Sequence, residues 1–157
     1  MINHRPTRFA VILPLMMLAT AMGTLPAGAQ SSPTIGRVKI VTGAAFVVRA
    51  GTPVPATPGL ALLETDSLKT GADGRLGVSL NDDTRISIGP DSEARLSRYR
   101  YAPAQGAIAL VLNFIRGAAV YASGQIAKLS PDAVRLETPA AIVGVRGTTV
   151  AVRVDPE

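Results

Sequence analysis

The sequence predicts an all-β protein with a single folded domain, and three observations support this prediction. Short runs of valine, isoleucine, leucine and threonine recur along most of the chain, with apolar residues at alternate positions. Turn-forming residues separate these runs at intervals of roughly ten residues. The chain also contains 15 glycines and 12 prolines. Both residues interrupt helices and strands, so most elements should be short.

The clearest alternation lies in two consecutive segments, residues 75–80 and 84–88. Leu76, Val78 and Leu80 would share one face of the first segment, and the second segment alternates in the same way. Between them, residues 81–83 read Asn-Asp-Asp, which is typical turn chemistry. The pattern predicts two strands joined by a tight turn.

Weaker alternation continues at residues 108–114, 134–136 and 150–154. The best helical candidate, residues 107–115, fits a strand equally well. Aspartates recur seven to nine residues apart, at positions 66, 73, 82 and 91. Short strands returning after such steps suit a coil of stacked β rungs as well as a sandwich. We expect a β-solenoid-like coil in preference to a sandwich.

The first 29 residues have the pattern of an export signal. A short basic head with Arg5 and Arg8 precedes an uncharged, largely apolar run over residues 9–22, and a small-x-small sequence ends at Ala29. The apolar run is shorter than the roughly 20 residues that a membrane-spanning helix needs. We expect a signal peptide at residues 1–29, cleavage after Ala29, and a periplasmic or secreted domain of residues 30–157 with no stable membrane span. Retention of the apolar run as an anchor is the alternative.

Removal of this leader leaves 14 basic residues against 11 acidic ones, a net charge of about +3. The chain has no cysteine, and its one histidine, His4, leaves with the leader. Nucleophilic catalysis needs a base beside the nucleophile. No Ser-x-x-Lys pair replaces the missing histidine. Paired carboxylates leave a cryptic hydrolase open, but the aspartates sit at turn positions. We expect no enzymatic activity, no metal and no cofactor.

A basic and aromatic segment stands out at residues 95–101. Alternation of arginine and tyrosine suits a strand face that contacts an acidic partner strand or an anionic surface glycan. The simpler interpretation is an exposed strand whose charges discourage edge-to-edge aggregation. Export argues against nucleic acid as the partner. We take the candidate binding residues to be Arg95, Arg98, Tyr99, Arg100 and Tyr101.

The most distinctive string covers residues 137–150. Pro139 can start a strand without donating to its ladder, and Gly144 and Gly147 permit a bulge or corner. Arg146, in a mostly apolar run, should be partly buried and therefore paired. We expect a structural role, with a ligand contact as the alternative. The residues concerned are Thr138, Pro139, Gly144, Arg146, Gly147 and Thr148.

At this string the chain resembles the FecR domain family, the periplasmic regulators of iron-transport signalling in bacteria. The matching pattern is Thr-Pro-x-Ala-x-x-Gly-x-Arg-Gly-Thr over residues 138–148, and segments near Gly36, Asp66 and Asp73 agree in order. The resemblance implies a β-rich, solenoid-like fold and an extracytoplasmic protein-binding role, with no catalytic residues to carry over.

The resemblance has one departure. Family members that control sigma factors place a cytoplasmic segment before a membrane helix, whereas only about eight residues precede the apolar run here. We therefore expect an exported module that binds a protein or an envelope polymer. The alternatives are a regulator of the anti-sigma type in iron-linked transmembrane signalling, and a structural component of the envelope.

Overall fold

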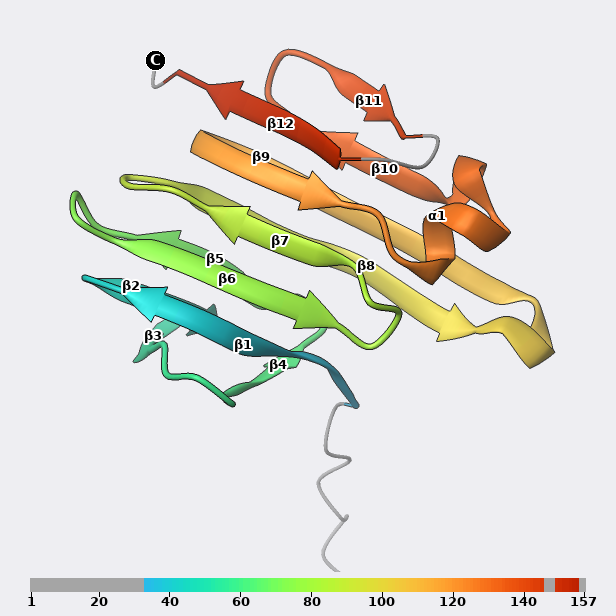
Figure 1. The fold of residues 1–157 in the computed structure, drawn as a ribbon, viewed down its shortest axis with the longest axis horizontal. Coiled ribbons are helices and arrows are strands. Elements are labelled where there is room, and N and C mark those ends of the chain that lie inside the picture. The colour runs from blue at the N-terminus through green and yellow to red at the C-terminus, as the bar shows by residue number, and fades with distance from the viewer. Residues whose placement is uncertain (1–32, 146–148, 156–157) are drawn as a thin grey trace, which may run out of the picture. The chain divides into compact units, whose positions relative to one another are not determined.

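The structure is a computed structural model that describes residues 33–145 and 149–155. Twelve strands in these residues pair into one curled sheet, and helical segments are short (Figure 1). The prediction of a single all-β domain is confirmed. None of the helices in these two ranges is long and apolar enough to cross a bilayer.

The strands are short, as the glycine and proline content predicts. In chain order they are β1 (Thr34–Thr42), β2 (Ala45–Arg49), β3 (Thr52–Pro55), β4 (Ala61–Leu63), β5 (Ser67–Thr70), β6 (Arg75–Leu80), β7 (Arg85–Ile88), β8 (Glu93–Ala102), β9 (Ala107–Ala122), β10 (Val134–Glu137), β11 (Ile142–Gly144) and β12 (Thr149–Val154). One α-helix, α1 (Gln125–Leu129), and two single 3-10 turns, Pro103–Gln105 and Pro131–Ala133, complete the described elements.

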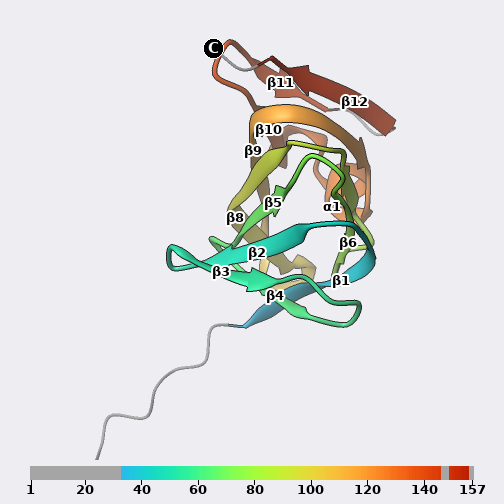
Figure 2. The ribbon, with the colours of Figure 1, turned by 90° about the vertical axis from the view of Figure 1, so that its left-hand side faces the viewer.

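The sheet curls so that its strands form two facing layers (Figure 2). Layer I contains, in order, β4, β1, β6, β7, the second half of β9 and β12. Layer II contains β3, β2, β5, β8, the first half of β9, β10 and β11. The 16-residue strand β9 belongs to both layers because its direction changes at Gly117, where φ is +82°. All strand pairs are antiparallel among the described residues except that of β9 with β10.

The predicted strand pair at residues 75–88 is present as β6 and β7. The two strands are antiparallel, with Leu76 opposite Ile88 and Val78 opposite Ile86. All four side chains are at most 2 % exposed, so the alternating apolar face points into the core. Full burial of one aliphatic side chain contributes about 1.5–3 kcal/mol to the stability of the fold. The alternation therefore explains which face of the hairpin packs into the core.

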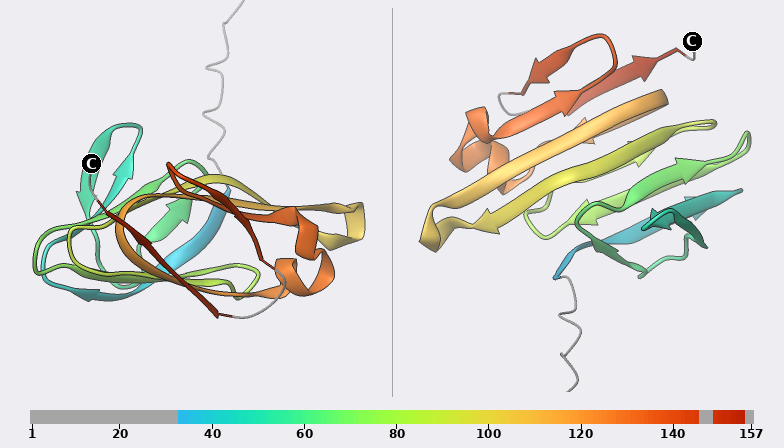
Figure 3. Two further views of the ribbon diagram at one scale, coloured as in Figure 1. Left: turned by 90° about the horizontal axis from the view of Figure 1, so that it is seen from above. Right: turned by 180° about the vertical axis from the view of Figure 1, so that it is seen from behind.

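The chain crosses between the layers at a series of corners along one side of the domain (Figure 3). These corners lie at residues 43–44, 71–74, 89–92 and 117. Backbone hydrogen bonds join each corner to the next. The Gly71 N–H donates to the Ala44 carbonyl at 2.8 Å, and the Asp91 N–H donates to the Gly71 carbonyl at 3.0 Å. The Gly89 N–H donates to the Ala118 carbonyl at 2.9 Å. We call this stack the corner line. The stacked corners of this domain are a feature that β-coils also have. Its strands, however, pair in antiparallel fashion as bent hairpins do.

The core lies between the two layers. Inward side chains of both layers belong to one continuous apolar cluster, and α1 adds Ile126 and Ala127 to it. The largest fully buried members are Tyr121, Leu62, Leu68, Leu76, Ile86, Leu96, Leu110, Leu112, Ile126 and Leu136. With the interior filled by packed side chains, the surfaces open to a ligand are the outer faces of the layers.

Candidate binding surface

The predicted basic and aromatic segment lies on β8, in layer II. The pairing of β8 with β9 shifts between Leu96 and Arg98, so Ser97 is an extra residue, a β-bulge. Beyond the bulge the alternation is reversed, and Tyr99 points into the core with 6 % of its surface exposed. Tyr101 is half-buried. The structure therefore leaves three of the five predicted residues, Arg95, Arg98 and Arg100, on the outer face.

Two of these three arginines already have partners within the domain. Arg95 Nε donates to the Ser67 hydroxyl at 3.2 Å. Arg100 forms an ion pair with Glu64 at 2.5 Å and also donates to the Tyr99 carbonyl. Burial alone would raise the pKa of Glu64, but hydrogen bonds from Arg100 and the Tyr99 amide outweigh burial. The net result is a pKa below the usual value, so the carboxylate is stabilised in its charged form. Of the three outward arginines, Arg100 therefore has its charge balanced by a carboxylate of the same domain.

Tyr99 instead contributes to a buried polar cluster around Asp82. Asp82 is fully buried in the turn between β6 and β7, and its carboxylate accepts four hydrogen bonds: two from Thr84, one from the Tyr99 hydroxyl at 3.3 Å and one from Ile126 N–H at 3.2 Å. Burial, with Asp82 close by, raises the pKa of Tyr99 well above its usual value. The cluster joins layer I, layer II and α1, so its carboxylate is committed to the fold.

The same is true of the second buried carboxylate, Asp66. Its side chain is 2 % exposed and receives two hydrogen bonds from the guanidinium of Arg49, at 3.1 and 2.7 Å. The Leu63 amide adds a third at 2.9 Å. Arg49 also donates to the Ala61 carbonyl at 2.8 Å. Bidentate pairing of this kind is strong and directional, and here it fixes the crossing from β4 to β5.

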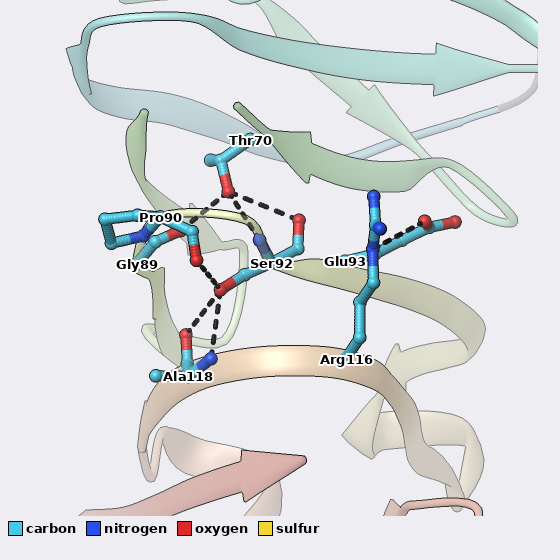
Figure 4. Close-up of polar contacts among 7 residues, drawn as sticks. All are labelled: Thr70, Gly89, Pro90, Ser92, Glu93, Arg116 and Ala118. Carbon is cyan, nitrogen blue, oxygen red and sulfur yellow. Dashed lines mark hydrogen bonds and ion pairs between the residues drawn. The ribbon is translucent and has the colours of Figure 1, made fainter. Parts of the chain in front are cut away.

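Hydroxyl groups stabilise the corner line (Figure 4). The Ser92 hydroxyl accepts the N–H of Ala118 at 3.0 Å and lies 2.9 Å from the Pro90 carbonyl. The Thr70 hydroxyl accepts the N–H of Ser92 at 3.0 Å and donates to the Gly89 carbonyl at 2.6 Å. Both hydroxyls are nearly inaccessible to solvent, and each links one corner to the next.

An ion pair lies beside these corners on layer II. Arg116 Nε is 3.7 Å from a Glu93 carboxylate oxygen, and both side chains are part-exposed (Figure 4). Such a pair contributes little to stability.

The hydroxyls of Thr70 and Ser92 are occupied by hydrogen bonds within the corner line. We therefore assign the corner line a structural role and no ligand.

The C-terminal string forms a small hairpin. The Thr138 hydroxyl accepts the N–H of Ala141 at 3.0 Å, and the Thr138 N–H donates to the Ala141 carbonyl at 2.8 Å, which closes the turn between β10 and β11. Pro139 and Gly144 are exposed. Arg146, Gly147 and Thr148 lie outside the described residues, so the prediction of a buried, paired Arg146 stays a prediction.

An open apolar surface lies elsewhere, on the outer face of layer I. A shallow depression of about 510 Å³ crosses the layer between β1 and β12. Small residues form its floor, and the exposed apolar side chains Ile40 (65 % exposed) and Val120 (43 %) lie along it. Its lining residues are Ile40, Arg75, Leu76, Gly77, Ser87, Ile88, Gly89, Ala118, Ala119, Val120, Ala151, Val152 and Arg153. No acidic residue is among them.

Metal-binding chemistry has no counterpart in the described residues. Within residues 33–145 and 149–155, no group of three or more histidine, cysteine, aspartate or glutamate side chains is placed to hold an ion. The two buried carboxylates, Asp66 and Asp82, accept three and four hydrogen bonds from donors of the fold, respectively.

These features define an all-β domain whose candidate site is an open outer face of its sheet. A family model described as FecR protein matches residues 66–157, which is more than half of the chain. The chain therefore belongs to the FecR family. FecR-domain proteins are associated with the bacterial envelope and with transmembrane signalling linked to iron transport. No curated protein and no solved structure matches the chain significantly.

Sequence reasoning missed the depression on layer I. Its residues come from β1, β6, β7, β9 and β12, which are far apart in the chain. Each strand contributes one or two small or apolar residues that face outward. Such residues form no recognisable pattern in the local sequence. The family match, in contrast, was anticipated from the residues at 138–148 and upstream.

Proposed function

We propose that this protein is an exported, non-enzymatic module of the bacterial envelope that acts by binding another protein. The observation that carries the proposal is the open apolar depression of layer I, with Ile40 and Val120 exposed. Contiguous exposed apolar surface on a small domain marks an interaction site. The signalling role of FecR-domain proteins supports a protein as the partner.

The buried polar groups support a binding role in preference to catalysis. Asp66 and Asp82 are the most buried carboxylates of the described domain, and they accept three and four hydrogen bonds from the fold, respectively. After removal of residues 1–29, the chain contains neither histidine nor cysteine to act as base or nucleophile.

Capture of the partner from envelope extract tests the binding function. The processed protein serves as bait beside two variants, Val120→Asp on layer I and the triple variant Arg95→Ser, Arg98→Ser, Arg100→Ser on β8. We expect one specific protein with the parent and the triple variant, and its loss with Val120→Asp. Loss with the triple variant alone would move the site to the β8 face. Degradation of a glycan or peptide, without capture, would contradict the binding function itself.

Export is tested separately by N-terminal sequencing of the periplasmic product. We propose that the mature chain begins at Gln30, after cleavage behind Ala29. A full-length product held in the inner membrane would contradict this, and would favour the alternative of an anchored signalling regulator.

A further inference from the structure

The depression of layer I is built from a single row of cross-strand neighbours. Ile40 lies opposite Gly77, Gly77 opposite Ser87, Ser87 opposite Val120, and Val120 opposite Ala151. We call this row the layer I furrow. A side chain added at Gly77 would contact Ile40 at 3.5 Å and Ser87 at 3.8 Å, which shows that these residues share one face. Five strands about 4.8 Å apart make the furrow about 19 Å long.

Arginines flank the furrow on both sides. On the side toward the corner line, Arg75 pairs with Thr42 and Arg153 pairs with Ala118. On the other side, Arg37 and Arg85 both pair with Ser79. Neighbouring rows on one face are two residues apart, or about 6.8 Å, so the two flanking rows are separated by about 14 Å.

These arginines are less engaged than those of β8. The side chains of Arg75 and Arg85 form no ion pair or hydrogen bond with any residue that the structure describes. Arg37 donates one hydrogen bond, to the Gly59 carbonyl at 3.3 Å. Arg153 meets Asp155 at 3.3 Å, but both side chains are more than 80 % exposed. The furrow therefore has four exposed arginines around it, and the exposed carboxylates of Asp91 and Asp155 lie near Arg153 at one end.

The dimensions favour a helix over an extended segment. An α-helix with its side chains is about 10–12 Å wide and would fit between arginine rows about 14 Å apart, with its flanks facing both rows. An extended strand is only about 5 Å wide and would reach one row. At 1.5 Å rise per residue, a furrow about 19 Å long accommodates roughly 13 helical residues, three to four turns.

The charges also decide between occupants. Residues 1–32 contain Arg5 and Arg8 and no acidic residue, so the N-terminal segment of this chain cannot neutralise the arginines. Two copies meeting by this face would bring two basic surfaces together, which is repulsive. A partner segment with carboxylates on both flanks of an apolar stripe matches the apolar floor and both basic rows.

We propose that the layer I furrow binds an acidic amphipathic helix of the partner protein, with a stripe of small or apolar residues on the furrow floor and Glu or Asp side chains facing Arg75, Arg153, Arg37 and Arg85. This rests on the proposed binding function and adds the chemistry of the partner. Helix-in-groove recognition of this kind takes its affinity from the apolar stripe and its specificity from the flanking charges.

A designed peptide tests this chemistry. The probe is a fluorescein-labelled 14-residue helical peptide with a Leu/Ala stripe flanked by Glu on both sides, and a second peptide carries Lys at the same positions. In anisotropy titrations of the processed protein, we expect binding of the Glu peptide only, weakened at high salt. Gly77→Val, which fills the furrow floor, and the double variant Arg75→Ser, Arg85→Ser should each weaken binding at least tenfold. The matched double variant Arg95→Ser, Arg98→Ser should stay within twofold of the parent.

Several results would overturn the inference: no binding of the Glu peptide, equal binding of the two peptides, or equal affinity of the parent and the Gly77→Val variant. A further arm uses phosphatidylglycerol vesicles without peptide. Vesicle binding that depends on Arg75 and Arg85, in the absence of peptide binding, would assign the furrow to an anionic membrane surface instead.

Site-specific photocrosslinking separates this inference from the proposed function. A photoreactive residue at Ser87, in the furrow, is compared with one at Arg98 on β8, each introduced into the full chain and exposed to envelope extract. We expect a crosslink from position 87 to a segment rich in Glu or Asp at helical spacing. A crosslink from position 98 alone would leave the binding function intact and overturn the furrow. Absence of crosslinks at both positions would contradict both.

Discussion

The corner line and the outer face of layer I belong to the same sheet but use polar and small residues in opposite ways. At the corners, the hydroxyls of Thr70 and Ser92 are buried and contact backbone groups of neighbouring corners. On layer I, Ser87 is exposed, and the side chains of Arg75 and Arg85 form no hydrogen bond or ion pair with a described residue. Contacts within the fold therefore distinguish the residues that maintain it from the residues that are available to a partner. Substitutions should divide in the same way.

The largest effect on stability is expected for Gly117→Ala. Gly117 has a φ of +82°, and an added Cβ would overlap Ser92, so the corner of β9 could not keep its geometry. We expect a loss of about 3 kcal/mol in the free energy of unfolding, measured by urea denaturation. Gly106 is the matched control, because its φ is +66° but nothing lies within 4 Å of an added Cβ. Gly106→Ala should cost about 1 kcal/mol. Equal losses would contradict a close approach at the corner.

Asp82→Ala should be nearly as damaging, because it leaves buried donors from Thr84, Tyr99 and Ile126 without an acceptor. We expect a loss of about 2–3 kcal/mol in thermal or chemical denaturation. The neighbouring Asp83 is exposed and has a φ of +66°, which asparagine tolerates. Asp83→Asn removes the same charge and should change stability by less than about 0.5 kcal/mol. A similar loss in both variants would indicate that overall charge matters more than the buried cluster.

Ser92→Ala compares the two regions directly. The substitution removes the acceptor for Ala118 N–H inside the corner line and should cost about 1–2 kcal/mol. Ser87→Ala makes the same chemical change on the outer face of layer I, where the residue is exposed. It should leave the unfolding midpoint within experimental error. If Ser87→Ala destabilises as much as Ser92→Ala, the outer face is not independent of the fold.

Alkaline pH should weaken the buried cluster through Tyr99. Its pKa is raised in the folded state, so the stability it contributes is complete below the ordinary tyrosine value of about 10 and is lost as the pH rises above it. We expect the melting temperature to fall above about pH 10 more steeply in the parent than in Tyr99→Phe, which has no ionisable hydroxyl at this position. Identical pH profiles would show that other groups control alkaline unfolding.

Much of the fold could be predicted because its strongest signals are local. The β6–β7 hairpin follows from strict alternation and an Asn-Asp-Asp turn, and both are visible within 14 residues of sequence, 75–88. Of the four regularly spaced aspartates, Asp73 and Asp91 lie in the corner line, whereas Asp66 and Asp82 are buried outside it. Antiparallel pairing of bent hairpins, in contrast, depends on contacts between distant segments, which a single sequence does not display.

The candidate site was harder to predict because two β-bulges change which side chains face outward. Without the extra residue Ser97, simple alternation would place Tyr99 and Tyr101 on the outer face with Arg95, as the sequence suggested. The extra residue Lys39 likewise turns Ile40 outward, although alternation from Val38 predicts burial. Both bulges are set by pairing with a neighbouring strand, so neither can be located from local sequence.

Gly77→Val is the one substitution in this set that should stabilise the fold, and it tests the contrast between the two regions most directly. Gly77 lies in the middle of β6 with no positive φ, and an added Cβ would make only ordinary contacts with Ile40 and Ser87. Glycine within a strand is unfavourable, whereas valine is a good strand former. We therefore expect the free energy of unfolding to rise by about 0.5–1 kcal/mol in urea denaturation. A glycine that the fold does not require is consistent with a furrow floor left open for a partner. If Gly77→Val instead destabilises the domain as strongly as Gly117→Ala, the glycine belongs with the corner line as a structural requirement, and its place in a binding surface loses its support.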